Sequence, residues 1–171
     1  MPALIKPYSK EMRSELRDIF FETSTLKEFK DEESKEAFFT KYLGFYLEHF
    51  PHLCFVVERD ERILGYVAGA SESLSKTLLS IQPHLEVFRD EIIKYPSHLH
   101  INFHKDAQGH GFGRNLISHL ESILKTHNIN GLHIMTGPDS PNRYFYQKLG
   151  FTFQIVKDFQ TSSILFMGKT I

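Results

Sequence analysis

Residues 99–113 read LHINFHKDAQGHGFG, and they lead directly into the pattern RNLISHLESILKTHN over residues 114–128. An apolar run, a polar turn and a glycine-rich loop therefore precede a predicted helix. The apolar residues of this helix fall on one stripe of a 3.6-residue period: Leu116, Ile117, Leu120, Ile123 and Leu124. Open backbone N–H groups and the helix dipole favour an anion at such a helix start. The stretch predicts a phosphate-bearing ligand.

The spacing of the loop disfavours two familiar nucleotide motifs. A Walker loop needs Gly-Lys-Ser/Thr, whereas residues 113–115 read GRN. The dinucleotide fingerprint G-x-G-x-x-G needs a third glycine, and its position holds Arg114 counted from Gly109, or Leu116 counted from Gly111. A nucleotide-binding domain of another fold is therefore disfavoured. On the loop alone, a glycine-rich turn without a ligand stays open.

Two motifs together resemble one enzyme family. Gln108, Gly111 and Gly113 form the pattern Q-x-x-G-x-G, which resembles the loop that holds the pyrophosphate of acetyl-coenzyme A in GNAT acyltransferases. From Ser140 the chain reads SPNRYFYQKLGFTF, which is similar to that family's second signature. The matching residues are Asn142, Tyr146, Lys148, Gly150 and Phe151. With one predicted helix and one strand between the motifs, residues 95–153 resemble a GNAT N-acetyltransferase.

The resemblance implies the fold. It implies one GNAT-like α/β domain over residues 1–171, with a mixed, mostly antiparallel central sheet of about six to seven strands, splayed at the cofactor site, and helices on both faces. The stretch YPSHLHINF over residues 95–103 also resembles, more weakly, the acetyltransferase-like domain of O-GlcNAcases. That subgroup implies an Asp where this chain has Asn102, which speaks against a carboxylate role at this position.

Composition limits the partners and the compartment. A chain of 171 residues with 41% hydrophobic and 24% charged residues is ordinary for one globular domain. A net charge of −1 without blocks of like charge speaks against nucleic acid or a membrane as the main partner. The single Cys54 excludes an internal disulfide, and no export or membrane-spanning segment is visible. We therefore expect a cytoplasmic protein. The histidines lack regular metal-ligand spacing, so no metal is expected.

Apolar periodicity predicts the other elements in order. Strands are expected at residues 3–8, 53–58, 63–70, 98–103, 131–135, 151–156 and 164–168, and helices at 10–22, 32–50 and 141–148. The aromatic stripe of residues 32–50 suits either a core or a wall of the acceptor pocket. Residues 71–96 form an insertion of mostly helical pattern, broken at Pro83. A structural embellishment and a lid over the acceptor site both remain open for it.

The resemblance also implies the cofactor and its contacts. Acetyl-coenzyme A would place its diphosphate on the N–H groups of residues 108–114, and its pantetheine arm along the backbone of residues 101–103. One N–H group there would face the thioester oxygen. The candidate cofactor-binding residues are Ile101, Asn102, Phe103, Gln108, Gly109, His110, Gly111, Phe112, Gly113, Arg114, Asn142 and Tyr146.

Three residues are candidates for the chemistry. Tyr146 suits a general acid, because a phenol is protonated at neutral pH and can pass its proton to a departing thiolate. A buried Tyr that packs the cofactor arm is the alternative. His98 and His100 are candidates for the general base, and serotonin N-acetyltransferases resemble this stretch in having His-Leu-His. That pair lies one residue away when counted from the loop, which reverses its facing on a strand. A satisfied or surface histidine therefore stays open.

The sequence supports two hypotheses of function. The first is an N-acetyltransferase that transfers an acetyl group to a primary amine of a small molecule, protein or peptide, by direct attack in a ternary complex with Tyr146 as general acid. The second is a catalytically inactive coenzyme A-binding domain with an interaction or regulatory role. The acceptor itself has no motif, and both a monomer and a homodimer are compatible with the chain.

Overall fold

The computed structural model describes residues 2–171, which form two compact units. One unit comprises the chain up to Gly69 together with His100–Leu120, and the other comprises Ala70–Leu99 and Glu121–Ile171. Seven strands form a mixed sheet in the order β1-β2-β3-β4-β5-β7-β6. Strand β4, Ser97–Phe103, passes from the second unit into the first. The mixed α/β fold that the sequence predicts is confirmed.

The first unit contains three antiparallel strands and four helices. Its strands are β1 (Leu4–Pro7), β2 (Cys54–Arg59) and β3 (Arg62–Ala70). Its helices are α1 (Arg13–Thr23), α2 (Glu32–Phe39), α3 (Phe45–His49) and the first part of α6 (Phe112–Thr126). Short 3-10 turns cover Lys10–Met12, Pro51–Leu53 and Lys105–Ala107. The single helix expected over residues 32–50 is interrupted by a π-helical turn, Thr40–Gly44.

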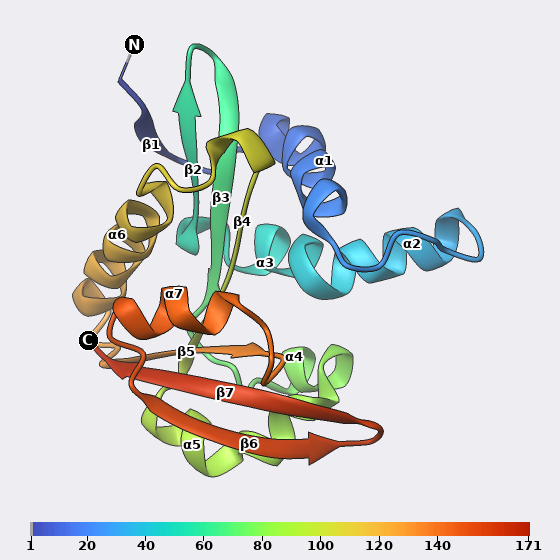
Figure 1. The fold of residues 1–171 in the computed structure, drawn as a ribbon, viewed down its shortest axis with the longest axis vertical. Helices are drawn as coiled ribbons and strands as arrows, with labels where there is room; N and C mark the ends of the chain where they lie inside the picture. Colours follow the sequence, from blue (N-terminus) through green and yellow to red (C-terminus); the bar gives the residue numbers. More distant parts are fainter. Residues whose placement is uncertain (1) are drawn as a thin grey trace. The chain divides into compact units, whose positions relative to one another are not determined.

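Alternation along β3 separates two layers of helices in this unit (Figure 1). Gly69 faces α6, where the side chain of Leu120 lies 3.2 Å from a Cβ built on the glycine. Tyr66 points to the other face, where its ring lies 5.9 Å from that of His100, which in turn lies 5.9 Å from Phe20 of α1. The two faces follow from the period of two in a strand.

The second unit contains the insertion and the C-terminal hairpin. The insertion forms α4 (Lys76–Ile81), a 3-10 turn (Pro83–Phe88) and α5 (Arg89–Lys94), so the predicted helical pattern with a break at Pro83 is confirmed. Strand β5 (Gly131–Thr136) pairs in parallel with β4 at Ser97 and His98, and antiparallel with β7 (Ser162–Thr170). Strand β6 (Phe153–Phe159) completes the hairpin with β7, and α7 spans Asn142–Lys148.

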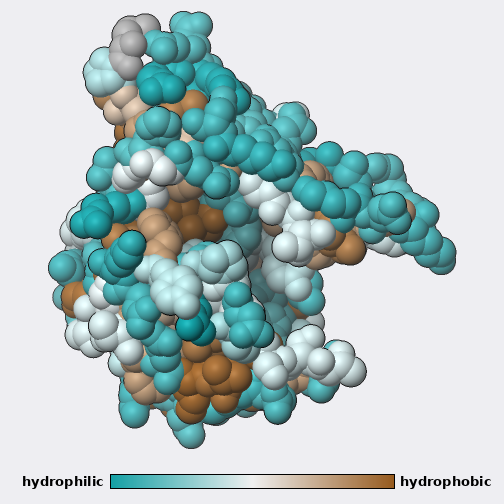
Figure 2. Space-filling model, in the orientation of Figure 1, coloured by the Kyte–Doolittle hydropathy of each residue, from teal (hydrophilic) through white to brown (hydrophobic). Residues whose placement is uncertain are grey.

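The insertion packs against the hairpin rather than standing apart as a linker. The rings of Phe88 and Phe166 stack with centroids 5.4 Å apart. Lys157 of β6 donates to the carboxylate of Glu91 at 2.7 Å and to the carbonyl of Val87 at 3.1 Å. Apolar surface also remains over the β6–β7 hairpin (Figure 2), where Val156 is 51% exposed. Within residues 2–171, no helix is both long enough and apolar enough to cross a membrane.

Candidate active site

The glycine loop has the backbone that its sequence requires. Gly109 and Gly111 have φ angles of +81° and +80°, in the left-handed region that favours glycine. Both are exposed, and a Cβ built on either would meet no atom within 4 Å. The loop is therefore open on its outer side, with room for a ligand to approach the backbone.

Helix α6 begins directly after this loop, at Phe112. The N–H of Asn115 donates to the carbonyl of Gly111 at 3.2 Å, which starts the helical bonding pattern. The N–H groups of the preceding first turn have no acceptor within an α-helix. Together with the positive end of the helix dipole and the exposed guanidinium of Arg114, they suit a diphosphate. The residues present therefore fit the anionic part of coenzyme A.

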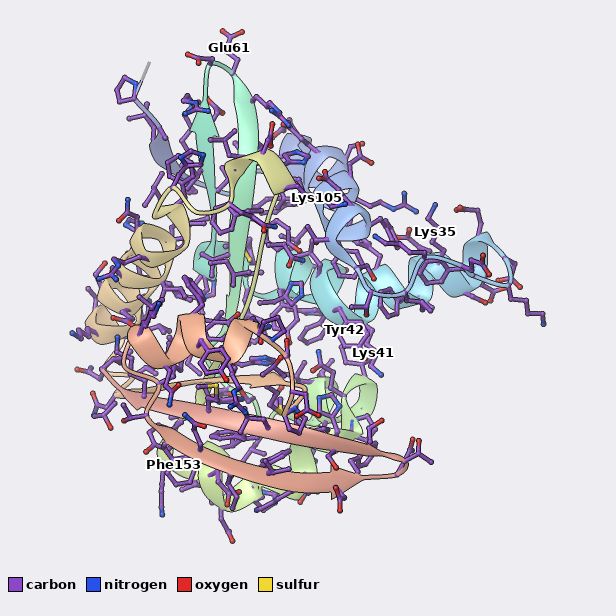
Figure 3. The ribbon with its side chains drawn as sticks, viewed as in Figure 1. Lys35, Lys41, Tyr42, Glu61, Lys105 and Phe153 are labelled. Carbon is purple, nitrogen blue, oxygen red and sulfur yellow. The ribbon has the colours of Figure 1, made fainter. Side chains whose placement is uncertain are left out.

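Hydrogen bonds and an ion pair hold residues 104–106, the turn that precedes the glycine loop. The carboxylate of Glu22, on the last turn of α1, bonds the ring of His104 and accepts from the N–H of Lys105 at 3.3 Å. The hydrogen bond with His104 holds the pKa of Glu22 below its usual value. Arg62 pairs with Asp106 at 2.8 Å. Figure 3 shows Lys105 beside α1, so this turn connects the loop to a helix of the same unit.

The second half of β4 lies against β3. Ile101, Asn102 and Phe103 are half-buried, and the N–H of His104 donates to the carbonyl of Leu64 at 2.9 Å. The ring of Phe103 lies over Gly65, because a Cβ built there would come within 2.1 Å of that ring. Phe103 thus faces the α6 layer, whereas the alternate residues His100 and Asn102 face Tyr66.

His100 lies in a largely apolar setting. Its ring contacts those of Phe20 and Tyr66, and burial lowers the pKa of His100 to about 4. Its Nδ1 lies 3.3 Å from the hydroxyl of Tyr66, which also accepts from the amide of Asn102 at 3.0 Å. Burial raises the pKa of the Tyr66 phenol far above its usual value. Tyr66 was not anticipated from the sequence, where it is one of several apolar residues on a strand.

His98 belongs to the second unit. It pairs with His133 across β4 and β5, and the two rings stack with centroids 4.9 Å apart. His133 bonds the carbonyl of Tyr95 through Nδ1, and burial lowers the pKa of His133 to about 4. His98 itself is 8% exposed, so it is a buried histidine rather than a surface one.

The second motif forms α7, in the same unit as His98. Tyr146 is 8% exposed, and its ring makes edge contacts with those of Phe145 and Phe151. The ring centroids lie 5.2 and 5.6 Å apart, respectively. Burial raises the pKa of Tyr146, so its phenol keeps its proton at neutral pH. Asn142 is exposed, and its amide oxygen accepts from the hydroxyl of Thr136 at 2.9 Å. Thr136 therefore turns the NH₂ group of Asn142 away from β5.

The candidate residues fall into two groups, one in each unit. The first unit brings together the glycine loop, the second half of β4 and His100, while the second unit holds His98, Asn142 and Tyr146. Three residues beside them, Glu22, Tyr66 and Thr136, were not predicted, because their contacts join different elements and no pattern within one element marks them. Among residues 2–171, no group of three or more His, Cys, Asp or Glu side chains is placed to hold a metal ion.

Several solved structures share this fold, and two of the three described next are of N-acetyltransferases. The structure of SsHAT is 19% identical to the chain, with a TM-score of 0.78 over 99% of this chain and 98% of that one. The PaiA N-acetyltransferase of Thermoplasma acidophilum, solved in complex with coenzyme A, is 16% identical with a TM-score of 0.66 over 100% of each chain. The polyamine N-acetyltransferase of Drosophila melanogaster, which forms N-acetylagmatine, is 12% identical with a TM-score of 0.67, over 99% and 100%.

The family model of the acetyltransferase (GNAT) family matches residues 10–151. This range contains both motifs, from the glycine loop to the Gly-Phe that follows α7. The chain therefore belongs to the GNAT acetyltransferase family, whose acyl donor is acetyl-coenzyme A.

Proposed function

We propose that this protein is an N-acetyltransferase that transfers an acetyl group to a primary amine, by direct attack of the amine in a ternary complex. The observation that carries the proposal is the glycine loop at the start of α6, where two left-handed glycines leave the backbone open beside an unsatisfied helix turn. When bound, acetyl-coenzyme A supplies the acetyl group as a thioester.

Residues of both motifs hold the cofactor in this proposal. The N–H groups of residues 108–114 bind the diphosphate, and Arg114 adds a positive charge. The backbone of residues 101–103 pairs with the amides of the pantetheine arm. Asn142, with its NH₂ group turned outward by Thr136, donates a hydrogen bond to the cofactor.

Tyr146 acts as the general acid. Its raised pKa keeps the hydroxyl protonated at neutral pH, as a proton donor must be. With acetyl-coenzyme A bound, the hydroxyl would supply a proton to the departing sulfur. The aromatic contacts with Phe145 and Phe151 fix the ring, which restricts the directions in which the hydroxyl points.

The amine must lose a proton before or during attack. His98 is our candidate for the first step of that path, because it lies on β4 beside the strand segment assigned to the cofactor. His100 belongs to the site as well, but a pKa of about 4 makes it a weak base at neutral pH.

The acceptor is expected to contact the helices that follow α1. Phe38 and Tyr42 form an aromatic pair there, with centroids 4.9 Å apart, and both rings are half-buried. Figure 3 shows Lys41 beside Tyr42, and its ammonium lies 5.1 Å from the centre of that ring. The two aromatic rings suit contact with an aromatic amine, whereas the Lys41 ammonium would repel a cationic one. That the Drosophila relative acts on a polyamine agrees with a primary amine as acceptor.

The compartment, the domain organisation and the oligomeric state of the enzyme are also part of the proposal. We place it in the cytoplasm, as one domain over residues 1–171 that acts as a monomer or homodimer, without nucleic acid or membrane as a partner. The single cysteine, Cys54, cannot form an internal disulfide, and burial raises the pKa of its thiol to about 12, so it is unreactive.

Thiol release from acetyl-coenzyme A, measured over a panel of primary amines, tests the activity. The wild type should release thiol with at least one amine. Tyr146→Phe should lower kcat roughly 100-fold or more with little change in cofactor affinity, because it removes a proton donor and keeps the ring. Tight binding of coenzyme A without transfer to any amine would favour the inactive, regulatory domain instead. Equal kcat in both proteins would show that Tyr146 is not the acid.

A further inference from the structure

A buried tyrosine on β3 connects two candidate residues on β4. Tyr66 is fully buried, and its hydroxyl lies 3.3 Å from Nδ1 of His100 and 3.0 Å from Nδ2 of Asn102. All three belong to the same unit, and their side chains meet on the α1 face of the strands. The contact therefore fixes the side chains of two candidate site residues, although Tyr66 matches neither sequence motif.

Hydrogen-bond capacity decides which group donates. The NH₂ group of Asn102 can only donate, so the Tyr66 oxygen accepts from it. The phenolic proton then needs an acceptor, and the structure places Nδ1 of His100 within reach. If Nδ1 carried the proton instead, the buried hydroxyl would have no acceptor among the contacts of the described residues, an expensive arrangement. The network thus assigns Nδ1 as an acceptor and puts the ring proton on Nε2.

This tautomer changes what His100 can do. With Nδ1 occupied by Tyr66 and Nε2 protonated, the ring has no lone pair available to remove a proton from an amine. What remains is an N–H donor, which suits an oxygen that gains negative charge during the reaction. Burial supports this role, since a ring with a pKa of about 4 stays neutral at working pH.

We propose that His100 donates a hydrogen bond through Nε2–H to the thioester oxygen of bound acetyl-coenzyme A, and that Tyr66 is the positioning residue that fixes this tautomer. The inference rests on the proposed function. It assigns His100 the role of a hydrogen-bond donor in place of that of a general base. The three hydrogen bonds run in one direction, from Asn102 through Tyr66 and His100 to the ligand, so that each polarises the next.

Nitrogen NMR of the histidine rings tests the tautomer without any turnover. In the free protein, Nδ1 of His100 should have the shift of an unprotonated nitrogen and Nε2 that of a protonated one, unchanged between about pH 5.5 and 8. Tyr66→Phe should mix the tautomers, while the matched control Tyr95→Phe should leave them unchanged. A protonated Nδ1, or an imidazolium at neutral pH, would overturn the assignment.

Ligand titration separates the oxygen from the rest of the cofactor. A ketone analogue of acetyl-coenzyme A, which keeps the carbonyl oxygen but cannot transfer its acyl group, should shift the Nε2–H resonance of His100. Free coenzyme A should bind without that shift. Equal shifts with both ligands, or a shift with neither, would contradict donation to the acyl oxygen. If neither ligand bound, the proposed function would be contradicted as well. The tautomer of the His100 ring in the free protein would still show whether Tyr66 fixes it.

Kinetics of two variants distinguish a donor from a base. His100→Gln keeps an N–H donor without a titrating group, so kcat should stay within about 10-fold of the wild type, whereas His100→Leu should lose roughly 100-fold or more. Tyr66→Phe should lower kcat with the KM for acetyl-coenzyme A unchanged. Equal losses in the Gln and Leu variants would contradict the donor role. Thermal unfolding of each variant excludes loss of the fold as the cause.

Discussion

At the scale of single residues, the backbone of Gly111 is the feature that would suit the glycine loop to a phosphate. Its φ of +80° is a conformation that residues with a side chain rarely adopt, and its outer side is open. Because the space is empty, a side chain there would meet no protein atom. What it would change is the backbone angle and the room left for a ligand.

Replacing Gly111 by alanine should therefore affect binding more than stability. We expect Gly111→Ala to lower stability by about 1–2 kcal/mol through strain, and to raise the KM for acetyl-coenzyme A by about 10-fold or more, as the loop shifts. Gly137→Ala is the matched control, because a Cβ there meets only Ser140, at 4.0 Å, and its φ is not left-handed. Thermal unfolding and steady-state kinetics measure both effects. An unchanged KM in Gly111→Ala would place the diphosphate elsewhere.

Sequence motifs could identify only those residues whose role depends on their immediate neighbours in the sequence. Gly109, Gly111 and Tyr146 stand in short patterns, so their backbone or burial could be anticipated. The Tyr66–His100 contact joins residues 34 positions apart, and the Glu22–His104 contact joins residues 82 positions apart. Such contacts depend on how strands and helices pack, which no pattern within a single element encodes.

At the scale of elements, the Lys157–Glu91 pair joins the insertion to the hairpin. The two side chains are 29% and 11% exposed, and the ammonium also lies 5.4 Å from the centre of the Phe88 ring. A partly buried ion pair of this kind holds its geometry, and removing Lys157 leaves the more buried Glu91 carboxylate poorly solvated. This contact favours a structural role for the insertion over that of a movable lid.

Lys157→Met should lower the free energy of unfolding by about 2 kcal/mol, between the values for exposed and buried pairs. The KM for the acceptor should not change if the insertion is structural. Lys76→Met, at an exposed position of α4, is the control and should be close to neutral. Urea unfolding and kinetics report the two effects. A changed acceptor KM at wild-type stability would instead support a lid.

Most elements could be predicted because their apolar residues repeat with the period of a helix or strand. The start of α6 was expected at Arg114, yet the helix begins at Phe112, because residues of the glycine motif already form its first turn. The π-helical turn of Thr40–Gly44 escaped prediction. Its aromatic and apolar residues fit an α-helical stripe equally well, and the difference lies in tertiary packing.

At the scale of the whole molecule, two histidines whose pKa is lowered by desolvation make stability depend on pH. The pKa of His133 and that of His100 are both lowered to about 4 in the folded chain, whereas an unfolded histidine titrates near 6.5. Between these values the unfolded chain binds more protons, so stability falls as the pH drops through that range and is fully present above about pH 6.5.

His133→Phe should remove one of these two contributions. The ring of His133 stacks on those of His98 and Phe166, so an aromatic replacement keeps contacts of the same kind. Stability at pH 7 should fall by about 1 kcal/mol through loss of the bond to Tyr95. The decrease in the free energy of unfolding between about pH 7 and 5 should become smaller by about 2 kcal/mol. Urea unfolding at both pH values measures this. An unchanged decrease would mean that His133 does not titrate in this way.

For the whole molecule, we propose that backbone N–H groups of the glycine loop bind the diphosphate of coenzyme A. Titration of the nitrogen-15-labelled protein with coenzyme A, followed by backbone amide shifts, tests this contact most directly. The amides of Gly109, Gly111, Phe112, Gly113 and Arg114 should shift together and saturate with one dissociation constant. Saturable binding that leaves these amides unperturbed, or no binding at all, would contradict it.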